Sequence, residues 1–152
     1  MSGRGPTTRA LTVLLAGLLL PLTGCGGDPQ QQYCAAVREH QKALTGIVTG
    51  GGQDALIRAL DIFQDLRSKA PSDVSDEWQQ VVTRIQALDR ALRDAGVDPA
   101  SYDRAKPPPG LSPAERADID AAARELGSRS TVEALDALDQ EARDVCRTPL
   151  SV

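Results

Sequence analysis

The chain has 152 residues, of which 41% are hydrophobic, and its 17 basic and 21 acidic residues give a formal net charge of −4. This length accommodates one domain with a single hydrophobic core. The acidic balance, with the basic residues scattered, argues against a nucleic-acid-binding surface. The chain has one Trp, two Tyr and one Phe, too few aromatic residues for a platform on which sugars or bases would stack.

The first 24 residues predict a signal peptide, which lies outside the folded domain. Arg4 and Arg9 give this segment a positive charge, and no acidic residue precedes Asp28. Residues 10–20 then form a largely apolar run. That run is about half as long as the roughly 20 residues that a permanent membrane-spanning helix needs. Pro21 ends the run, because proline cannot continue a helix.

The apolar run is followed by Leu22-Thr23-Gly24-Cys25. A branched apolar residue, two small residues and a cysteine in this order resemble the lipobox of bacterial lipoproteins. The resemblance implies that the thiol of Cys25 carries a diacylglyceryl group, that the chain is cut before Cys25, and that lipid chains such as palmitate anchor the mature protein. Two or more such chains suffice for stable membrane attachment. The alternative is an ordinary secretory signal that leaves Cys25 as a free thiol.

The mature protein is expected on the extracytoplasmic face of the cell membrane. Residues 25–32 are predicted to form a flexible tether to a domain that spans residues 33–150. Loss of the two signal-peptide arginines leaves 15 basic against 21 acidic residues, a net charge of −6. Anionic headgroups would repel such a domain, so attachment should depend on the lipid on Cys25.

Two further cysteines, Cys34 and Cys146, lie near the two ends of the domain. Outside the cytosol, a remaining pair of cysteines most simply forms a disulfide. A redox-active pair is the alternative, but the Cys-x-x-Cys spacing typical of such sites is absent.

Apolar residues recur at helical spacing throughout the mature chain, and no alternating strand pattern occurs. Five helices are predicted: from Asp28-Pro29 to just before Gly50, 54–69, 74–95, 112–126, and from a capping box at Ser130 to just before Pro149. Residues 97–111 contain Pro107-Pro108-Pro109 and are predicted to form a crossover linker; docking of these prolines on a partner is the alternative.

The fold class predicted is all-α, a bundle with a four-helix core and one flanking helix, 112–126. A Cys34–Cys146 bridge requires the start of the first helix and the end of the last to meet. Five helices in strict up-and-down alternation would place these ends at opposite poles. We therefore expect the linker 97–111 to break the alternation.

No local pattern indicates a catalytic set, a metal site or a cofactor site. His40, the only histidine, lies on an apolar stripe and is interpreted as structural. Trp78 and Phe63 are expected in the core. Many of the acids are assigned to solvated helix faces, because four of them precede a basic residue at i, i+4; the pairs are Asp65–Lys69, Asp89–Arg93, Asp120–Arg124 and Asp139–Arg143. A calcium site at Asp118 and Asp120, or at Asp136 and Asp139, is a weaker alternative because no oxygen-rich loop accompanies either pair.

Ala70-Pro71, Trp78 and the late cysteine also resemble the small, two-cysteine, all-helical lipoproteins of actinobacteria. That resemblance supports the fold and the location and implies no activity. The function expected is therefore a non-catalytic binding or scaffolding module at the cell envelope, with an envelope protein as partner. A carrier of a small apolar ligand between bundle helices is the alternative, and an enzyme is a remote third.

Overall fold

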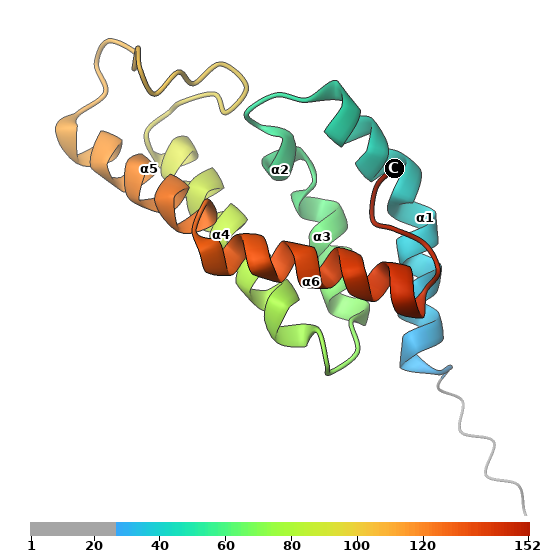
Figure 1. Ribbon diagram of the computed structural model, residues 1–152. Helices are drawn as coiled ribbons and strands as arrows, with labels where there is room; N and C mark the ends of the chain where they lie inside the picture. Colours follow the sequence, from blue (N-terminus) through green and yellow to red (C-terminus); the bar gives the residue numbers. More distant parts are fainter. Residues whose placement is uncertain (1–26) are drawn as a thin grey trace, which may run out of the picture.

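The computed structural model describes residues 27–152, which form six helices and no strand (Figure 1). One disulfide links the first helix to the end of the last, so the predicted all-α bundle with one disulfide is confirmed. The helices are α1 (Pro29–Gly50), α2 (Ala55–Arg58), α3 (Leu60–Lys69), α4 (Ser75–Asp94), α5 (Pro113–Leu126) and α6 (Arg129–Val145).

Local chemistry accounts for several helix ends. The carboxylate of Asp28 accepts a hydrogen bond from the backbone N–H of Gln30 at 3.1 Å, ahead of the proline that opens α1. Ser112 and Glu115 form the predicted capping box at the start of α5. Gly96 follows α4 with φ 65°, and the N–H of Val97 reaches the carbonyl of Leu92 at 2.9 Å, which closes a Schellman motif.

The helix predicted over 54–69 is divided into α2 and α3 at Ala59. Neither proline nor glycine causes this break; Ala59 keeps near-helical angles, φ −81° and ψ −7°, and is buried. Both α2 and α3 lie against α1 and α4, and α2 is the nearer of the two to the segment 97–111 (Figure 1). Ile57 on α2 lines a pocket together with residues of α5 and also packs against the main core, which Phe63 on α3 enters.

The capping box predicted at Ser130 is wrong by two residues. The N-cap of α6 is Ser128, whose hydroxyl accepts from the N–H of Thr131. Glu133 instead pairs with Arg129 on the helix surface. Thr131 is fully buried, and its hydroxyl donates to the carbonyl of Glu125 at 3.0 Å. This bond ties the end of α5 to the first turn of α6.

The joint between α5 and α6 breaks the up-and-down alternation, whereas the linker 97–111 was expected to do so. That segment returns at the end of the molecule where α4 finishes, so it is no crossover (Figure 1). The two helices then run in succession along α4: α5 lies on its C-terminal half and α6 on its N-terminal half. Helices α5 and α6 together therefore run in one direction, antiparallel to α4. For this reason the start of α1 and the end of α6 meet at one pole of the molecule.

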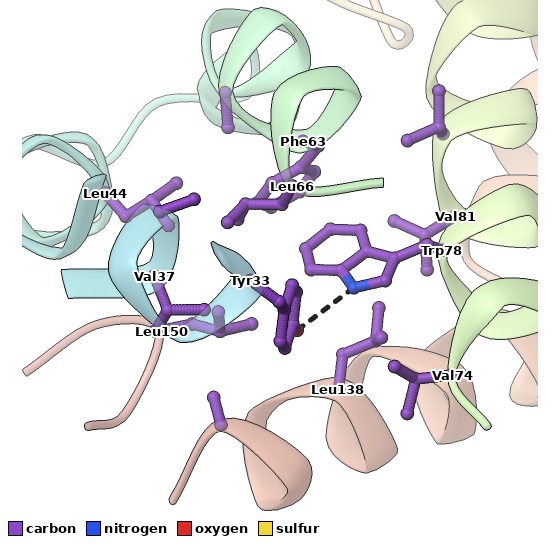
Figure 2. Close-up of a cluster of buried hydrophobic side chains, with 14 of the residues drawn as sticks. Tyr33, Val37, Leu44, Phe63, Leu66, Val74, Trp78, Val81, Leu138 and Leu150 are labelled. Atoms are coloured by element: carbon purple, nitrogen blue, oxygen red, sulfur yellow. Dashed lines mark hydrogen bonds between the residues drawn. The ribbon is translucent and has the colours of Figure 1, made fainter. Parts of the chain in front are cut away.

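A single main core joins α1, α3, α4 and α6 (Figure 2). Trp78 and Tyr33 are its largest fully buried side chains, and the rings of Phe63 and Trp78 pack edge to face with centroids 5.4 Å apart. The core prediction for Trp78 and Phe63 is thus confirmed. Helix α5 contributes only the partly buried Leu126 to this core, as expected of a flanking helix.

Two further buried residues, Leu92 on α4 and Ile119 on α5, lie outside the main core. They belong to the part of the molecule that also holds α2, the turn at residues 50–52 and the segment 97–111 (Figure 1). We call this part the distal end. The disulfide end is the opposite part, where α1 begins and α6 finishes.

Candidate functional site

The predicted lipidation site, Cys25, lies outside the described residues. Residues 29–32, which the sequence assigns to the flexible tether, belong to α1. Three residues, 26–28, therefore separate Cys25 from the first helix. A lipid on Cys25 would hold the start of α1 close to the membrane.

Cys34 and Cys146 form the predicted disulfide, with an S–S distance of 2.01 Å and Cα atoms 5.0 Å apart. Both cysteines are buried. Residues after Cys146 turn back along α1: the side-chain amide of Gln41 donates to the carbonyl of Pro149 at 3.1 Å, and the N–H of Val152 donates to the hydroxyl of Thr45 at 3.1 Å. The disulfide and this tail together fix α6 against α1.

A buried hydrogen bond joins the two largest aromatic residues near the disulfide. The indole N–H of Trp78 donates to the hydroxyl oxygen of Tyr33 at 3.1 Å (Figure 2). Burial raises the pKa of Tyr33 to about 12, although the bond from Trp78 acts in the opposite direction. Tyr33 is therefore neutral in the folded protein at physiological pH, and the pair has a structural role.

His40 lies at the surface of the α1–α3 contact. Its Nε2 is 2.8 Å from Oδ2 of Asp65, and the other carboxylate oxygen of Asp65 binds Lys69. These bonds, first that from Lys69 and then that from His40, lower the pKa of Asp65. The His40 side chain is 22% exposed and joins two helices, in agreement with its structural interpretation.

The four predicted i, i+4 pairs of an acidic and a basic residue have three different outcomes in the structure. Asp65–Lys69 and Asp139–Arg143 form on partly exposed faces as predicted, and Asp139 also accepts from the N–H of Leu150 at 3.0 Å. Asp89 pairs with Arg93, but Asp89 is 5% exposed, so its assignment to a solvated face is wrong. Asp120 does not pair with Arg124; it lies beside Arg104 of the segment 97–111.

The calcium alternatives receive no support from the structure. Within residues 27–152, no group of three or more His, Cys, Asp or Glu side chains is arranged to hold a metal ion. Asp118 faces a groove between α4 and α5, whereas Asp120 lines a different pocket. Asp136 is exposed, and Asp139 is engaged by Arg143 and the C-terminal tail.

A pocket of about 170 Å³ lies at the distal end between α2, α4, α5 and the segment 97–111. We call it the distal pocket. Its apolar walls come from Ile57, Leu88, Leu92, Pro99, Ile119 and Ala123. Gln53 and Arg104, both exposed, also line it and face the solvent side. The side-chain amide of Gln53 reaches the carbonyl of Ala100 at 3.4 Å, which links the glycine turn to the segment above the pocket.

The distal pocket also contains two polar residues whose bonding is incomplete. The hydroxyl of Tyr102 and Oδ1 of Asp120 are shut off from solvent, and neither has a hydrogen-bond partner among the described residues. Arg104 Nε lies 2.8 Å from Oδ1 of Asp120, an ion-pair distance without the alignment of a hydrogen bond. Buried polar groups are nearly always paired, so the hydroxyl of Tyr102 is an exception here, whereas Oδ1 of Asp120 is compensated by the charge of Arg104.

A second apolar pocket, of about 190 Å³, lies between α1, α2, α6 and the C-terminal tail. Leu44, Leu56, Phe63, Leu135 and Leu150 are among its lining residues. Both pockets are smaller than the roughly 300–1,000 Å³ of typical small-molecule sites.

The distal pocket is not predicted from the sequence, because its polar residues lie on two segments of the chain that no local pattern connects. Tyr102 and Arg104 were part of a linker, and Asp120 was assigned to a surface pair with Arg124. The available signal was the stripe Ile119, Ala123 and Leu126, which places Asp120 at the edge of the apolar face of α5.

No protein-family model matches the chain, and no curated protein or solved structure matches it at a significant level. Among residues 27–152, none of the helices combines the length and apolar character required to cross a membrane.

Proposed function

We propose that this protein is a lipid-anchored, non-catalytic module on the outer face of the cytoplasmic membrane, and that its distal end binds a partner protein. The observation that carries the proposal is the polarity of the fold. The helix that follows the lipobox begins at the disulfide end, whereas the glycine turn and the distal pocket lie at the opposite end.

The disulfide supports an extracytoplasmic location, because such bridges persist in oxidising compartments. Acidic side chains near the disulfide end fit attachment by lipid alone. Burial raises the pKa of Glu141, and the negative charges of Asp73 and Asp144 raise it further, so these carboxylates lie close together. A surface of this kind would not adhere to anionic headgroups.

A carrier of a small apolar ligand is the second candidate, because both pockets have apolar walls. Their volumes of about 170 and 190 Å³ admit one ring or a short chain, less than a typical carried ligand occupies. An enzyme would need a carboxylate of raised pKa in a cleft. Glu141 has a raised pKa but does not line the distal pocket.

Anchoring is tested by labelling cells with radioactive palmitate and fractionating them. The wild-type chain should incorporate label and sediment with membranes, whereas Cys25→Ser should be unlabelled and either unprocessed or secreted. Identical labelling and fractionation of both forms would refute the lipid anchor.

Partner binding is tested by photo-crosslinking in intact cells from exposed positions at both ends. Probes at Gln53 and Lys106 report on the distal end, and probes at Gln31 and Arg147 report on the disulfide end. We expect a specific adduct from the distal probes. If a specific protein is captured only from the disulfide-end probes, the binding surface lies at the disulfide end and the proposed distal binding surface is refuted.

A further inference from the structure

We propose that residues 147–152, which we call the tail, occupy a peptide-binding groove between α1 and α6. An extended segment of a partner protein, with an aromatic anchor side chain, competes with the tail for this groove. We call the site the tail groove; it is formed by Gln41, Leu44, Thr45, Leu135 and Asp139. This inference goes beyond the proposed function, because the tail groove is separate from the distal pocket.

Three main-chain groups of the tail bond to side chains on two helices. These bonds join Nε2 of Gln41 to the carbonyl of Pro149 at 3.1 Å, the N–H of Leu150 to Oδ1 of Asp139 at 3.0 Å, and the N–H of Val152 to Oγ1 of Thr45 at 3.1 Å. Gln41 and Thr45 lie one turn apart on α1, and Asp139 belongs to α6. Main-chain bonds hold an extended peptide whatever its side chains are, so the tail groove is not restricted to the sequence of the tail.

One side chain of the tail is its anchor. Leu150 is 8% exposed and lies among the side chains of the main core (Figure 2). The other tail side chains are exposed or half-buried, and Val152 is 77% exposed. In grooves that bind extended peptides, main-chain bonds supply affinity and a pocket for a side chain supplies selectivity. The tail is held in the same way.

The tail fills its groove incompletely. The apolar pocket of about 190 Å³ borders Leu150 and has walls from Leu44, Phe63 and Leu135. An anchor larger than leucine would therefore gain contacts that the tail lacks. Arg147, the first residue of the tail, has φ 55°, a left-handed conformation that is unfavourable for a residue other than glycine. Release of the tail relieves this strain, so both features favour its displacement.

The space beside Leu150 also identifies the competitor. A tail that belongs to the same chain is present at a high effective concentration, which an identical tail on a second copy does not match. A partner segment with an aromatic residue at the anchor position fills part of the 190 Å³ pocket, and so has additional contacts to set against that advantage. We therefore assign the competing segment to a partner protein.

The probes are pentapeptides with a fluorophore at the amino end and an amide at the other end. One, Thr-Pro-Leu-Ser-Val, copies residues 148–152, and a second has phenylalanine in place of leucine. Fluorescence anisotropy with the disulfide-intact protein measures binding. We expect the phenylalanine peptide to bind about fivefold more tightly than the leucine peptide, because it fills more of the pocket. Equal affinities would refute the aromatic anchor.

A third peptide tests the main-chain bonds. It carries N-methylphenylalanine at the anchor position and therefore lacks the N–H that Asp139 accepts. We expect it to bind about tenfold more weakly than the phenylalanine peptide. If methylation leaves the affinity unchanged, the groove does not recognise a peptide main chain and the proposal fails.

Variants test competition by the tail. Leu150→Ala removes the internal anchor and should raise the affinity for the phenylalanine peptide about tenfold, because a larger fraction of molecules then has a free groove. Added to Leu150→Ala, Thr45→Val should weaken binding about fivefold, and Thr49→Val, which replaces a hydroxyl bonded within α1, is its matched control. A folded Leu150→Ala variant that binds no peptide, or binds it no better than wild type, would overturn the proposal.

Hydrogen exchange in the wild-type protein tests opening of the tail without any substitution. The amide of Leu150 should exchange at least about a hundredfold faster than that of Leu138, which is fully buried on α6. Equally slow exchange of the two amides would show that the tail is not released. Light scattering tests the source of the competing segment, and we expect wild type to be monomeric. A dimer that Leu150→Ala abolishes would assign the groove to the tail of a second copy and overturn the partner assignment.

Discussion

The disulfide end and the distal end are built from the same amphipathic helices, but their interiors are filled differently. At the disulfide end, Trp78, Tyr33 and Leu138 are fully buried, and the one aromatic N–H there has a partner. At the distal end, Leu92 and Ile119 are buried beside a pocket of about 170 Å³. There the hydroxyl of Tyr102 has no hydrogen-bond partner within the described chain, and Oδ1 of Asp120 has only its ion pair with Arg104.

This difference predicts that stability is distributed unevenly between the two ends of the molecule. A filled core gains dispersion and hydrophobic energy at every contact, whereas atoms that face a void forfeit part of it. The covalent cross-link also lies at the filled end. We therefore expect the disulfide end to carry most of the free energy of folding, and the distal end to open more readily. The predictions below test that contrast, from the largest effect to the smallest.

Removal of the disulfide should have the largest effect. Cys34 and Cys146 are 112 residues apart, and a cross-link that closes a loop of about 100 residues is worth about 4–5 kcal/mol in the chain-entropy model. The double variant Cys34→Ser, Cys146→Ser should lose about that much free energy of unfolding in urea. Cys25→Ser, which leaves the bridge intact, is the control. A double variant as stable as the control would show that the cross-link does not stabilise the filled end.

Leu→Ala substitutions compare the two interiors directly. Leu138→Ala should cost about 3–4 kcal/mol, because it opens a cavity in a closely packed core. Leu92→Ala should cost about 2 kcal/mol, because Leu92 already borders a pocket and has fewer contacts to lose. Urea unfolding measures both changes, and hydrogen exchange should show the α5 amides exchanging faster than those of α4 near Trp78. Equal costs at the two sites would contradict the contrast.

Tyr→Phe substitutions compare a satisfied hydroxyl with an unsatisfied one. Tyr33→Phe leaves the buried indole N–H of Trp78 without an acceptor and should cost about 1–3 kcal/mol. Tyr102→Phe removes a hydroxyl that has no partner and should not destabilise the protein. A loss at Tyr102 as large as that at Tyr33 would show that its hydroxyl has an unrecognised partner.

The buried hydroxyl of Tyr33 also predicts that the stability of the protein decreases at alkaline pH. The pKa of Tyr33 is about 12 in the folded protein against 10.0 normally. The unfolded state therefore releases this proton first, and stability is lost as pH rises from about 10 to about 12. Tyr33→Phe should remove that part of the pH profile, as measured by urea unfolding at each pH.

Loss of the surface ion pairs that Asp65 forms with His40 and Lys69 should have the smallest effect on stability. Asp65 is 37% exposed, so Asp65→Asn should cost less than about 1 kcal/mol at neutral pH. Because bonds from Lys69 and His40 lower the pKa of Asp65, its contribution is present above the ordinary pKa of 3.8 and is lost as pH falls below it. Thermal unfolding of wild type and variant should therefore converge in acid. Asp136→Asn, at an exposed position on α6, is the control and should show no such convergence.

Local patterns in the sequence were enough for the all-helical class, for the approximate positions of most helices, and for the core and the bridge. The helical spacing of Trp78, Val81 and Ile85 and the Ser112–Glu115 capping box each depend on only a few neighbouring residues. The disulfide follows from counting the cysteines that remain after Cys25. Hydrogen-bonding preferences and hydrophobic periodicity determine such features without knowledge of distant neighbours.

Tertiary structure alone decided how these helices are joined and which charged side chains pair. The bend at Ala59, the shift of the α6 cap to Ser128 and the continuation of α5 into α6 all depend on which neighbour each helix packs against. Asp120 could equally have met Arg124 on its own helix or Arg104 on another segment, and only the path of residues 97–111 selects Arg104. The distal pocket exists because three helices and that segment meet without filling the space between them, and no single stretch of sequence encodes such a gap.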